Sequence, residues 1–175
     1  MTRSKGMIRA TNRTATEDKK RASAERRSGR LAEPVICDGC GSLYAGRVWR
    51  REHKPTAVLL ERAAWRRCPA CTQMRGGEYW GRVVLRGAFS AADATAVRRR
   101  IDNVAARAEY TQPQRRVLSV ERDGAGLEVL TTSQKLAHRI ARELRKAFGG
   151  RVAYKWSDDG SLFAEWRRAE SATRA

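Results

Sequence analysis

The 175-residue sequence predicts an α+β fold, and two observations carry that prediction. Four cysteines stand in two close pairs in the first half of the chain, and the second half alternates between short apolar runs and amphipathic helical patterns. Because the two features occupy different stretches, we expect a cysteine-bearing module at 33–76 and an α+β sandwich domain at 77–168. The remaining segments, 1–32 and 169–175, are polar, and we expect them to be disordered tails.

The larger domain shows the order β-α-β-β-α-β, followed by one extra strand. Apolar runs rich in β-branched and aromatic residues predict strands at 79–86, 116–122, 126–131, 151–156 and 162–168. Apolar residues at three- and four-residue spacing predict helices at 90–110 and 133–148. Ser90 and Asp93 resemble a capping box, and Asp123-Gly124 indicates a hairpin turn. The order is that of a ferredoxin-like split βαβ unit with an added strand.

The cysteines form two Cys-x2-Cys motifs with 27 residues between them: Cys37, Cys40, Cys68 and Cys71. Each motif turns the backbone so that two thiolates converge on one ion, and two such motifs make the closed tetrahedral shell of a structural zinc site. We expect the stretch between the motifs to form a hairpin with strands near 45–51 and 57–66, which would make the module a zinc ribbon.

Iron is the alternative ion, because ligand type does not separate tetrathiolate iron from zinc. The two motifs also look like those of rubredoxin, an iron redox carrier. The basic surroundings and Thr72 after the last cysteine favour zinc, since small electron carriers are usually acidic. A closed shell leaves no open position for catalysis, and the sequence has neither a phosphate-binding loop nor a Ser-His-Asp set. We therefore expect a protein that is not an enzyme.

The net charge of +18 favours a polyanionic partner. Segment 1–32 alone has ten basic and three acidic residues, a net charge of +7. Nucleic acid is the commonest partner of this kind, and an anionic membrane surface is the second. No apolar run approaches the roughly 18 residues that span a bilayer, and the first residues lack the apolar core of a secretory signal. We expect a cytoplasmic protein that binds nucleic acid and no membrane.

Two groups of basic residues are candidate RNA contacts, because Arg and Lys pair with phosphate. The first lies in the cysteine module and is interleaved with Trp49 and Trp65, which either stack on bases or pack the module: Arg47, Arg50, Arg51, Arg66 and Arg67. The second lies on the polar side of the helix predicted at 133–148: Lys135, Arg139, Arg142, Arg145 and Lys146. We interpret the late aromatic residues as core and sheet cover: Tyr154, Trp156, Phe163 and Trp166.

The order of these motifs resembles a family of small bacterial zinc-ribbon proteins. The resemblance covers about 33–168 and rests on CDGCGSLYAGRVWR, on RRCPACTQMRGGEYWGRVVLRGAF and on LEVLTTSQKLAHRIARELRKAFGG. That family is similar to the N-terminal region of the archaeal and eukaryotic adaptor for export of the large ribosomal subunit, the nonsense-mediated decay protein three. The resemblance implies zinc at all four cysteines and an association with large-subunit ribosomal RNA or its assembly.

The sequence as a whole favours a zinc-binding RNA-binding protein that associates with the ribosome, and performs no chemistry. A DNA-binding regulator is one alternative, although each predicted helix is followed by a strand and none makes a helix-turn-helix. A rubredoxin-like iron redox carrier is the other alternative.

Overall fold

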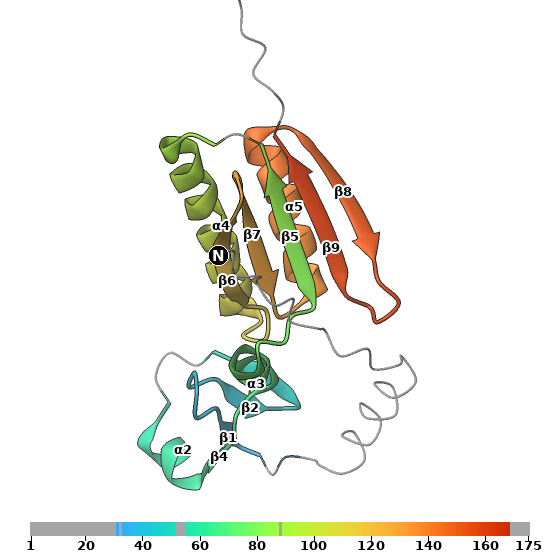
Figure 1. The fold of residues 1–175 in the computed structure, drawn as a ribbon. Coiled ribbons are helices and arrows are strands. Elements are labelled where there is room, and N and C mark those ends of the chain that lie inside the picture. The colour runs from blue at the N-terminus through green and yellow to red at the C-terminus, as the bar shows by residue number, and fades with distance from the viewer. Residues whose placement is uncertain (1–30, 32, 52–54, 88, 169–175) are drawn as a thin grey trace, which may run out of the picture.

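The computed structural model describes residues 31, 33–51, 55–87 and 89–168, and it is an α+β fold with two mixed sheets (Figure 1). A four-stranded sheet belongs to the cysteine module, and a five-stranded sheet belongs to the larger domain. The two tails expected to be disordered lie outside the described residues, apart from Leu31.

The larger domain has the predicted order of strands and helices. Its elements are β5 (Gly81–Arg86), α4 (Ala91–Thr111), β6 (Val117–Asp123), β7 (Gly126–Thr131), α5 (Gln134–Phe148), β8 (Arg151–Trp156) and β9 (Leu162–Arg167). The predicted capping box is confirmed, because the Ser90 hydroxyl accepts from the Asp93 backbone N–H at 3.1 Å and the Asp93 carboxylate accepts from the Ser90 N–H. The amphipathic pattern and the caps together explain where these helices begin.

The strand order of this sheet is β6-β7-β5-β9-β8, with β9 parallel to β5. In a ferredoxin-like sheet, the strand that follows the second helix lies beside the first strand and antiparallel to it. Here that strand, β8, lies at the edge, and the chain turns back so that β9 takes the inner place. The burial patterns give the reason: Leu162, Ala164 and Trp166 are buried at alternate positions of β9, whereas β8 is mostly exposed. The ferredoxin-like arrangement is therefore not confirmed.

Helices α4 and α5 cover one face of the five-stranded sheet (Figure 1). The core lies between them and the sheet, where Val83, Leu85, Ile101, Ile140 and Trp166 are fully buried. An ion pair between Arg100 and Glu143 joins the two helices. Within the described ranges, no helix combines the length and the apolar character needed to cross a membrane.

The opposite face of the sheet carries charges that neutralise one another. Arg82 pairs with Glu128, Arg86 Nη1 lies 3.2 Å from an Asp123 carboxylate oxygen, and Arg167 Nε lies 2.6 Å from a Glu165 carboxylate oxygen. Surface pairs of this kind contribute little to stability. They occupy guanidinium groups of the inner strands, whereas Arg151 and Lys155 of the edge strand β8 lie on the same face without an ion pair among the described residues.

The cysteine module contains four short strands and two short helices. They are β1 (Val35–Ile36), β2 (Leu43–Ala45), β3 (Val48–Arg50), α2 (Ala57–Arg62), β4 (Ala64–Trp65) and α3 (Pro69–Gly76). The strand order is β3-β2-β1-β4, and β4 runs parallel to β1.

The two strands predicted at 45–51 and 57–66 are wrong in this module. The first is interrupted because Gly46 and Arg47 adopt φ values of 59° and 63°, which close a tight hairpin between β2 and β3. In the second, the Thr56 hydroxyl accepts from the Leu59 N–H at 3.3 Å and starts α2, so only Ala64–Trp65 remains a strand. The expected zinc-ribbon hairpin is therefore not confirmed.

The larger domain depends on a close approach of α5 to β5 at Gly81. A Cβ atom at this position would lie 2.5 Å from the Ala137 Cβ and 2.5 Å from the Thr131 Oγ1. We expect Gly81→Ala to lower the free energy of unfolding by about 1–3 kcal/mol, because the core has no room for the methyl group. Urea unfolding followed by far-UV circular dichroism measures the change.

Gly76→Ala is the matched control. A Cβ at Gly76 would make only ordinary contacts, at 3.5 Å or more, and the position lies in a helix. This variant should leave the unfolding transition of the domain unchanged. Equal stability of the Gly81 and Gly76 variants would show that α5 does not pack on β5 in this way.

Candidate metal centre

The pairing of β1 with β4 brings the two cysteine motifs to one end of the small sheet. Cys37 follows β1 directly, and Cys68 comes three residues after β4. The two strands are parallel, and the Arg66 N–H continues the pairing by donating to the Ile36 carbonyl oxygen at 3.0 Å. Parallel strands end at the same edge of a sheet, so both motifs reach the same place.

Each motif has a local geometry that turns its second sulfur toward the first. In the first motif, the Gly41 N–H donates to the Cys37 carbonyl oxygen at 2.9 Å, and Gly41 has a φ of 70°. In the second motif, Cys68 is the N-cap of α3, and Pro69 occupies the first turn. Cys71 therefore lies one helical turn from Cys68 and faces the same point.

The four cysteine sulfurs lie within 4.8 Å of one another, and all four cysteines are free thiols. The Sγ atoms of Cys40 and Cys68 are 3.8 Å apart. Four sulfurs at about 2.3 Å from a central ion, at the corners of a tetrahedron, are separated by about 3.8 Å. The predicted ligand set is thus brought together with the spacing that a single metal ion needs.

Backbone N–H groups point at these sulfurs. The Cys37 Sγ accepts from the N–H groups of Gly39, at 3.4 Å, and Cys68, at 3.2 Å, and the Cys68 Sγ accepts from the Cys71 N–H at 3.4 Å. Such hydrogen bonds orient thiolate ligands and stabilise their charge. A side chain at position 39 would lie 3.1 Å from the Cys71 Sγ, so the first motif has space for glycine there and little more.

The thiols of the metal-free site differ in their pKa values. Burial raises the pKa of Cys71 to about 11, and burial also raises the pKa of Cys68 strongly. Burial opposes ionisation of Cys40 as well, but hydrogen bonds with the Ser42 hydroxyl and backbone outweigh it and lower that pKa to about 6. At neutral pH, therefore, Cys40 is already a thiolate, while Cys68 and Cys71 must lose protons to bind a metal.

The larger domain contributes one side chain to the metal centre. The Arg116 Nη1 lies 3.6 Å from the Cys71 Sγ, and the Arg116 Nε donates to the Pro113 carbonyl oxygen at 2.8 Å. The side chain of Arg116 is only 11% exposed, and Glu109 lies 3.6 Å from its Nη2. A tetrathiolate around a divalent ion carries net negative charge, which this guanidinium offsets. No signal in the sequence points to Arg116, which lies 45 residues from Cys71.

The basic residues predicted in the cysteine module do not form one surface. Arg67 is bound to Asp38 through two contacts of 3.1 Å and links the two cysteine motifs. Arg51 pairs with Glu109 at 2.6 Å and links the module to α4. The remaining three are exposed at opposite edges of the small sheet, with two on the β2–β3 hairpin and one after β4: Arg47, Arg50 and Arg66.

The two tryptophans of the module have different environments. Trp49 is buried and packs against Tyr44, with ring centroids 5.2 Å apart. Its side chain therefore belongs to the small core around Val35 and the cysteines. Trp65 is 57% exposed on the edge strand β4, so packing accounts for one of the two rings.

The basic residues predicted on the second helix do lie on a single face. They follow the solvent side of α5, opposite the buried Leu136, Ile140 and Leu144. Four are exposed and Arg139 is partly buried, and none of the five forms an ion pair in the part of the chain that the structure describes: Lys135, Arg139, Arg142, Arg145 and Lys146.

The interpretation of the late aromatic residues as core and sheet cover holds for Trp166, which is fully buried, but not for β8. Tyr154 is 40% exposed and Trp156 is 59% exposed, because β8 is an edge strand that α5 covers only in part. The Tyr154 ring stacks on His138 of α5, with centroids 4.8 Å apart. The predicted ferredoxin-like order would have given this strand an inner position.

No protein-family model, curated protein or solved structure matches this chain. The resemblance to the ribosome export adaptor therefore stays a prediction.

The metal should hold the module together, because the buried cluster around the cysteines is small: Val35, Cys37, Trp49, Cys68 and Ala70. We expect chelation, or Cys68→Ser, to abolish hydrogen-exchange protection throughout 33–76 and to leave the core of β5, β7 and α5 protected. Hydrogen exchange with mass spectrometry measures both regions at once. Chelator should have no further effect on the Cys68 variant, and unchanged protection of 33–76 after complete metal removal would contradict the prediction.

Metal binding should release protons and strengthen with pH. Because Cys68 and Cys71 are protonated in the metal-free protein at pH 7, at least two protons leave, and the affinity should rise by about two powers of ten per pH unit. Titration calorimetry with Zn²⁺ in buffers of different ionisation enthalpy counts the protons. Ser42→Ala should increase proton release at pH 7, since it removes the Ser42 hydroxyl hydrogen bond that lowers the pKa of Cys40. A binding heat independent of the buffer would contradict this prediction.

Proposed function

We propose that this protein is a non-catalytic RNA-binding protein whose first module is stabilised by structural zinc. The observation that carries the proposal is the face formed by α5 and β8, where cations without ion-pair partners lie beside exposed aromatic rings. We call this face, made of the five α5 cations with His138, Tyr154 and Trp156, the α5–β8 face.

The closed donor set supports a structural metal ion, and zinc is the ion that we propose. Four thiolates close the tetrahedral shell, so a bound zinc ion supplies four strong metal–sulfur bonds and no open position for a substrate. Two arginines lie at the cysteine cluster, with Arg116 beside Cys71 and Arg67 paired with Asp38. Metal analysis of the purified protein separates the candidates: zinc gives one equivalent in a colourless protein, and iron gives a red protein that bleaches on reduction.

The charges of the α5–β8 face support a polyanionic ligand. In the same domain, three arginines of the sheet and of α4 are paired with carboxylates: Arg82, Arg86 and Arg100. The five cations of α5 are not, and they follow one side of a helix of 15 residues. A row of cations attracts the phosphate backbone of a nucleic acid, and such binding weakens as the salt concentration rises.

The aromatic side chains of the same face support a single-stranded ligand. Tyr154 and Trp156 expose ring surface on the side of β8 that faces α5, and His138 stacks on Tyr154. Arg145 and Arg142 lie close enough to act on the pKa of the Tyr154 phenol, although burial has the larger effect and raises it. Aromatic rings beside cations are the arrangement on which unpaired bases stack while their phosphates are neutralised.

The ribosome is the RNA-containing partner that we propose, and the sequence resemblance to the large-subunit export adaptor supports this choice. Ribosomal RNA offers single-stranded loops and a dense phosphate surface to a chain with a net charge of +18. Zinc holds the module that carries α3, and the α5–β8 face makes the contacts, so the protein acts by docking alone.

The proposal predicts that neutralising the α5 cations weakens RNA binding. We expect the triple variant Arg142→Gln, Arg145→Gln, Lys146→Gln to bind a single-stranded RNA oligonucleotide at least tenfold more weakly, with the slope of log affinity against log salt reduced by about 2. Filter binding at several salt concentrations measures both. In lysate gradients, the wild-type protein should sediment with large subunits at low salt, and the variant should remain at the top.

The matched control removes three exposed arginines from other surfaces: Arg62→Gln, Arg99→Gln and Arg107→Gln. The control has the same net charge as the test variant, so a nonspecific effect of charge would weaken both equally. Equal binding by the two variants would contradict a role for the α5–β8 face. Stronger binding to duplex DNA than to RNA would instead favour a DNA-binding regulator.

A further inference from the structure

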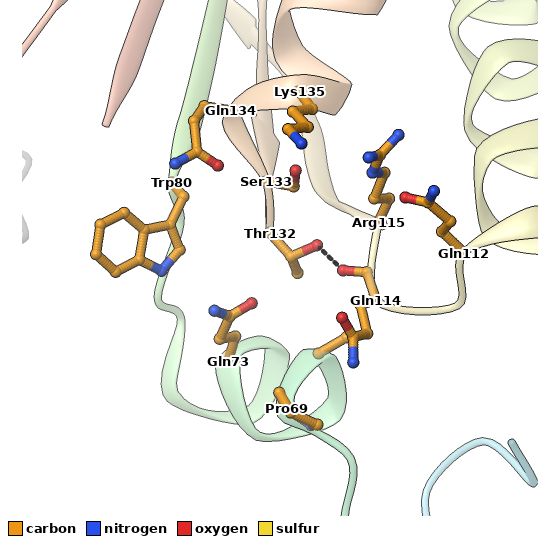
Figure 2. A pocket seen from close by; sticks show the side chains of 11 residues that line it. Pro69, Gln73, Trp80, Gln112, Gln114, Arg115, Thr132, Ser133, Gln134 and Lys135 are labelled. Carbon is orange, nitrogen blue, oxygen red and sulfur yellow. Dashed lines mark hydrogen bonds between the residues drawn. The ribbon is translucent and has the colours of Figure 1, made fainter. Parts of the chain in front are cut away.

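A cavity of about 420 Å³ lies between the metal module and the start of α5. Its walls come from three places: α3 of the metal module, the connection between α4 and β6, and the segment from Thr132 to Lys135. Trp80, which precedes β5, lines one side of the cavity (Figure 2). The volume falls within the roughly 300–1,000 Å³ that is typical of small-molecule sites.

Most of the eleven residues that line this cavity carry polar side chains, and none of them is acidic. Lys135 and Arg115 provide two cations. Figure 2 shows the Gln73 amide and the Lys135 ammonium group reaching into the space from opposite walls. Five lining side chains have no hydrogen-bond or ion-pair partner among the described residues: Gln73, Gln112, Gln114, Arg115 and Lys135.

By contrast, the neighbouring groups that belong to the fold are already satisfied. The Thr132 hydroxyl donates to the Gln114 carbonyl oxygen at 2.7 Å and accepts from the Arg116 N–H at 2.9 Å. The Gln134 amide donates to the Gly160 carbonyl oxygen at 3.3 Å. The cavity therefore combines side chains held by hydrogen bonds within the fold with polar side chains that remain available to a ligand.

We propose that this pocket holds one nucleotide unit of an RNA strand. The phosphate lies against Lys135 and Arg115, because cations without partners attract it and no lining carboxylate repels it. The base lies toward Trp80 and the glutamine amides, since an indole offers a stacking surface and amides pair with base edges. This inference rests on the proposed function, because it names a specific subsite for the same ligand.

The pocket is continuous with the α5–β8 face. Lys135 lines the pocket and is also the first cation of the α5 row. An RNA strand that lies along α5 toward the N-terminus of the helix therefore stays in contact with cations until it reaches the pocket. The α5–β8 face attracts the backbone, and the pocket adds contacts to one base.

The metal centre positions one wall of the pocket. Pro69, Ala70 and Gln73 line it from α3, the helix whose N-cap is the metal ligand Cys68. Arg115 lies on the opposite wall and is adjacent in the chain to Arg116, which contacts the Cys71 Sγ. Loss of the metal should therefore remove the subsite while α5 keeps its cations.

The test follows the Trp80 indole and Gln73 amide resonances of the zinc-loaded full chain by NMR. The probes are a ten-nucleotide single-stranded RNA, the nucleoside monophosphate UMP and inorganic phosphate. We expect the RNA to shift both resonances, and we expect Arg115→Gln with Gln73→Leu to abolish the shift of the Trp80 indole and to weaken RNA binding by about tenfold. Arg75→Gln, an exposed cation of α3 outside the pocket, is the matched control and should change neither.

The outcomes separate the pocket from the proposed function. If the RNA binds and depends on Arg142, Arg145 and Lys146 but shifts neither resonance, the pocket is overturned and the proposed function stands. If UMP shifts the resonances and RNA does not, the pocket binds a free nucleotide, and the inference that it binds a unit of an RNA strand is wrong. Equal shifts with inorganic phosphate alone would overturn the base contacts. Arg115→Gln by itself, which leaves α3 intact, repeats the test if the double variant fails to fold.

Discussion

The convergence of four cysteine sulfurs on one point is the constraint on which the first module depends. The module has too few buried apolar side chains to fold on hydrophobic burial alone, and its strands are two or three residues long. The pairing of β1 with β4 and the start of α3 both place cysteines at the same edge. Since Cys68 belongs to the cysteine cluster and also caps α3, an ion bound by the cluster would fix the direction of that helix. The contact between Arg116 and Cys71 extends the constraint into the larger domain.

The larger domain separates its charges into two kinds of surface. On the open face of the sheet, arginines and carboxylates on neighbouring strands neutralise one another, as Arg82 does with Glu128. On α5, the acidic residue Glu143 turns toward Arg100 of α4, and the other charges of the helix remain positive and free of ion pairs within the described residues. The proposed RNA-binding role follows from this separation rather than from net charge, which a sequence gives for the whole chain and not for a face.

The sequence predicts correctly those helices and strands whose buried side chains recur at a regular spacing. The helices at 90–110 and 133–148 and the strands of the larger domain were predicted because burial on one side leaves a regular pattern. The cysteine cluster was predicted because the Cys-x2-Cys spacing is typical of tetrathiolate metal sites. The helix at Ala57–Arg62 was missed because Val58, Leu59 and Leu60 suggest a buried strand, while the Thr56 cap decides the outcome. The place of β8 at the edge and the contact of Arg116 with Cys71 depend on the folded topology, which leaves no local signal.

The exposed edge of β8 has a consequence for the behaviour of many copies of the chain together. An edge strand presents unpaired backbone groups, on which a second molecule can add a strand of its own. Arg151 and Lys155 project from this edge strand, and the cations of α5 lie beside it. A second copy that approaches in the same way brings the same charges, so electrostatic repulsion opposes edge-to-edge aggregation. A polyanion that neutralised these cations would remove the electrostatic repulsion between copies. At high protein concentration, edge-to-edge association through β8 should therefore be most favourable when a polyanion is bound.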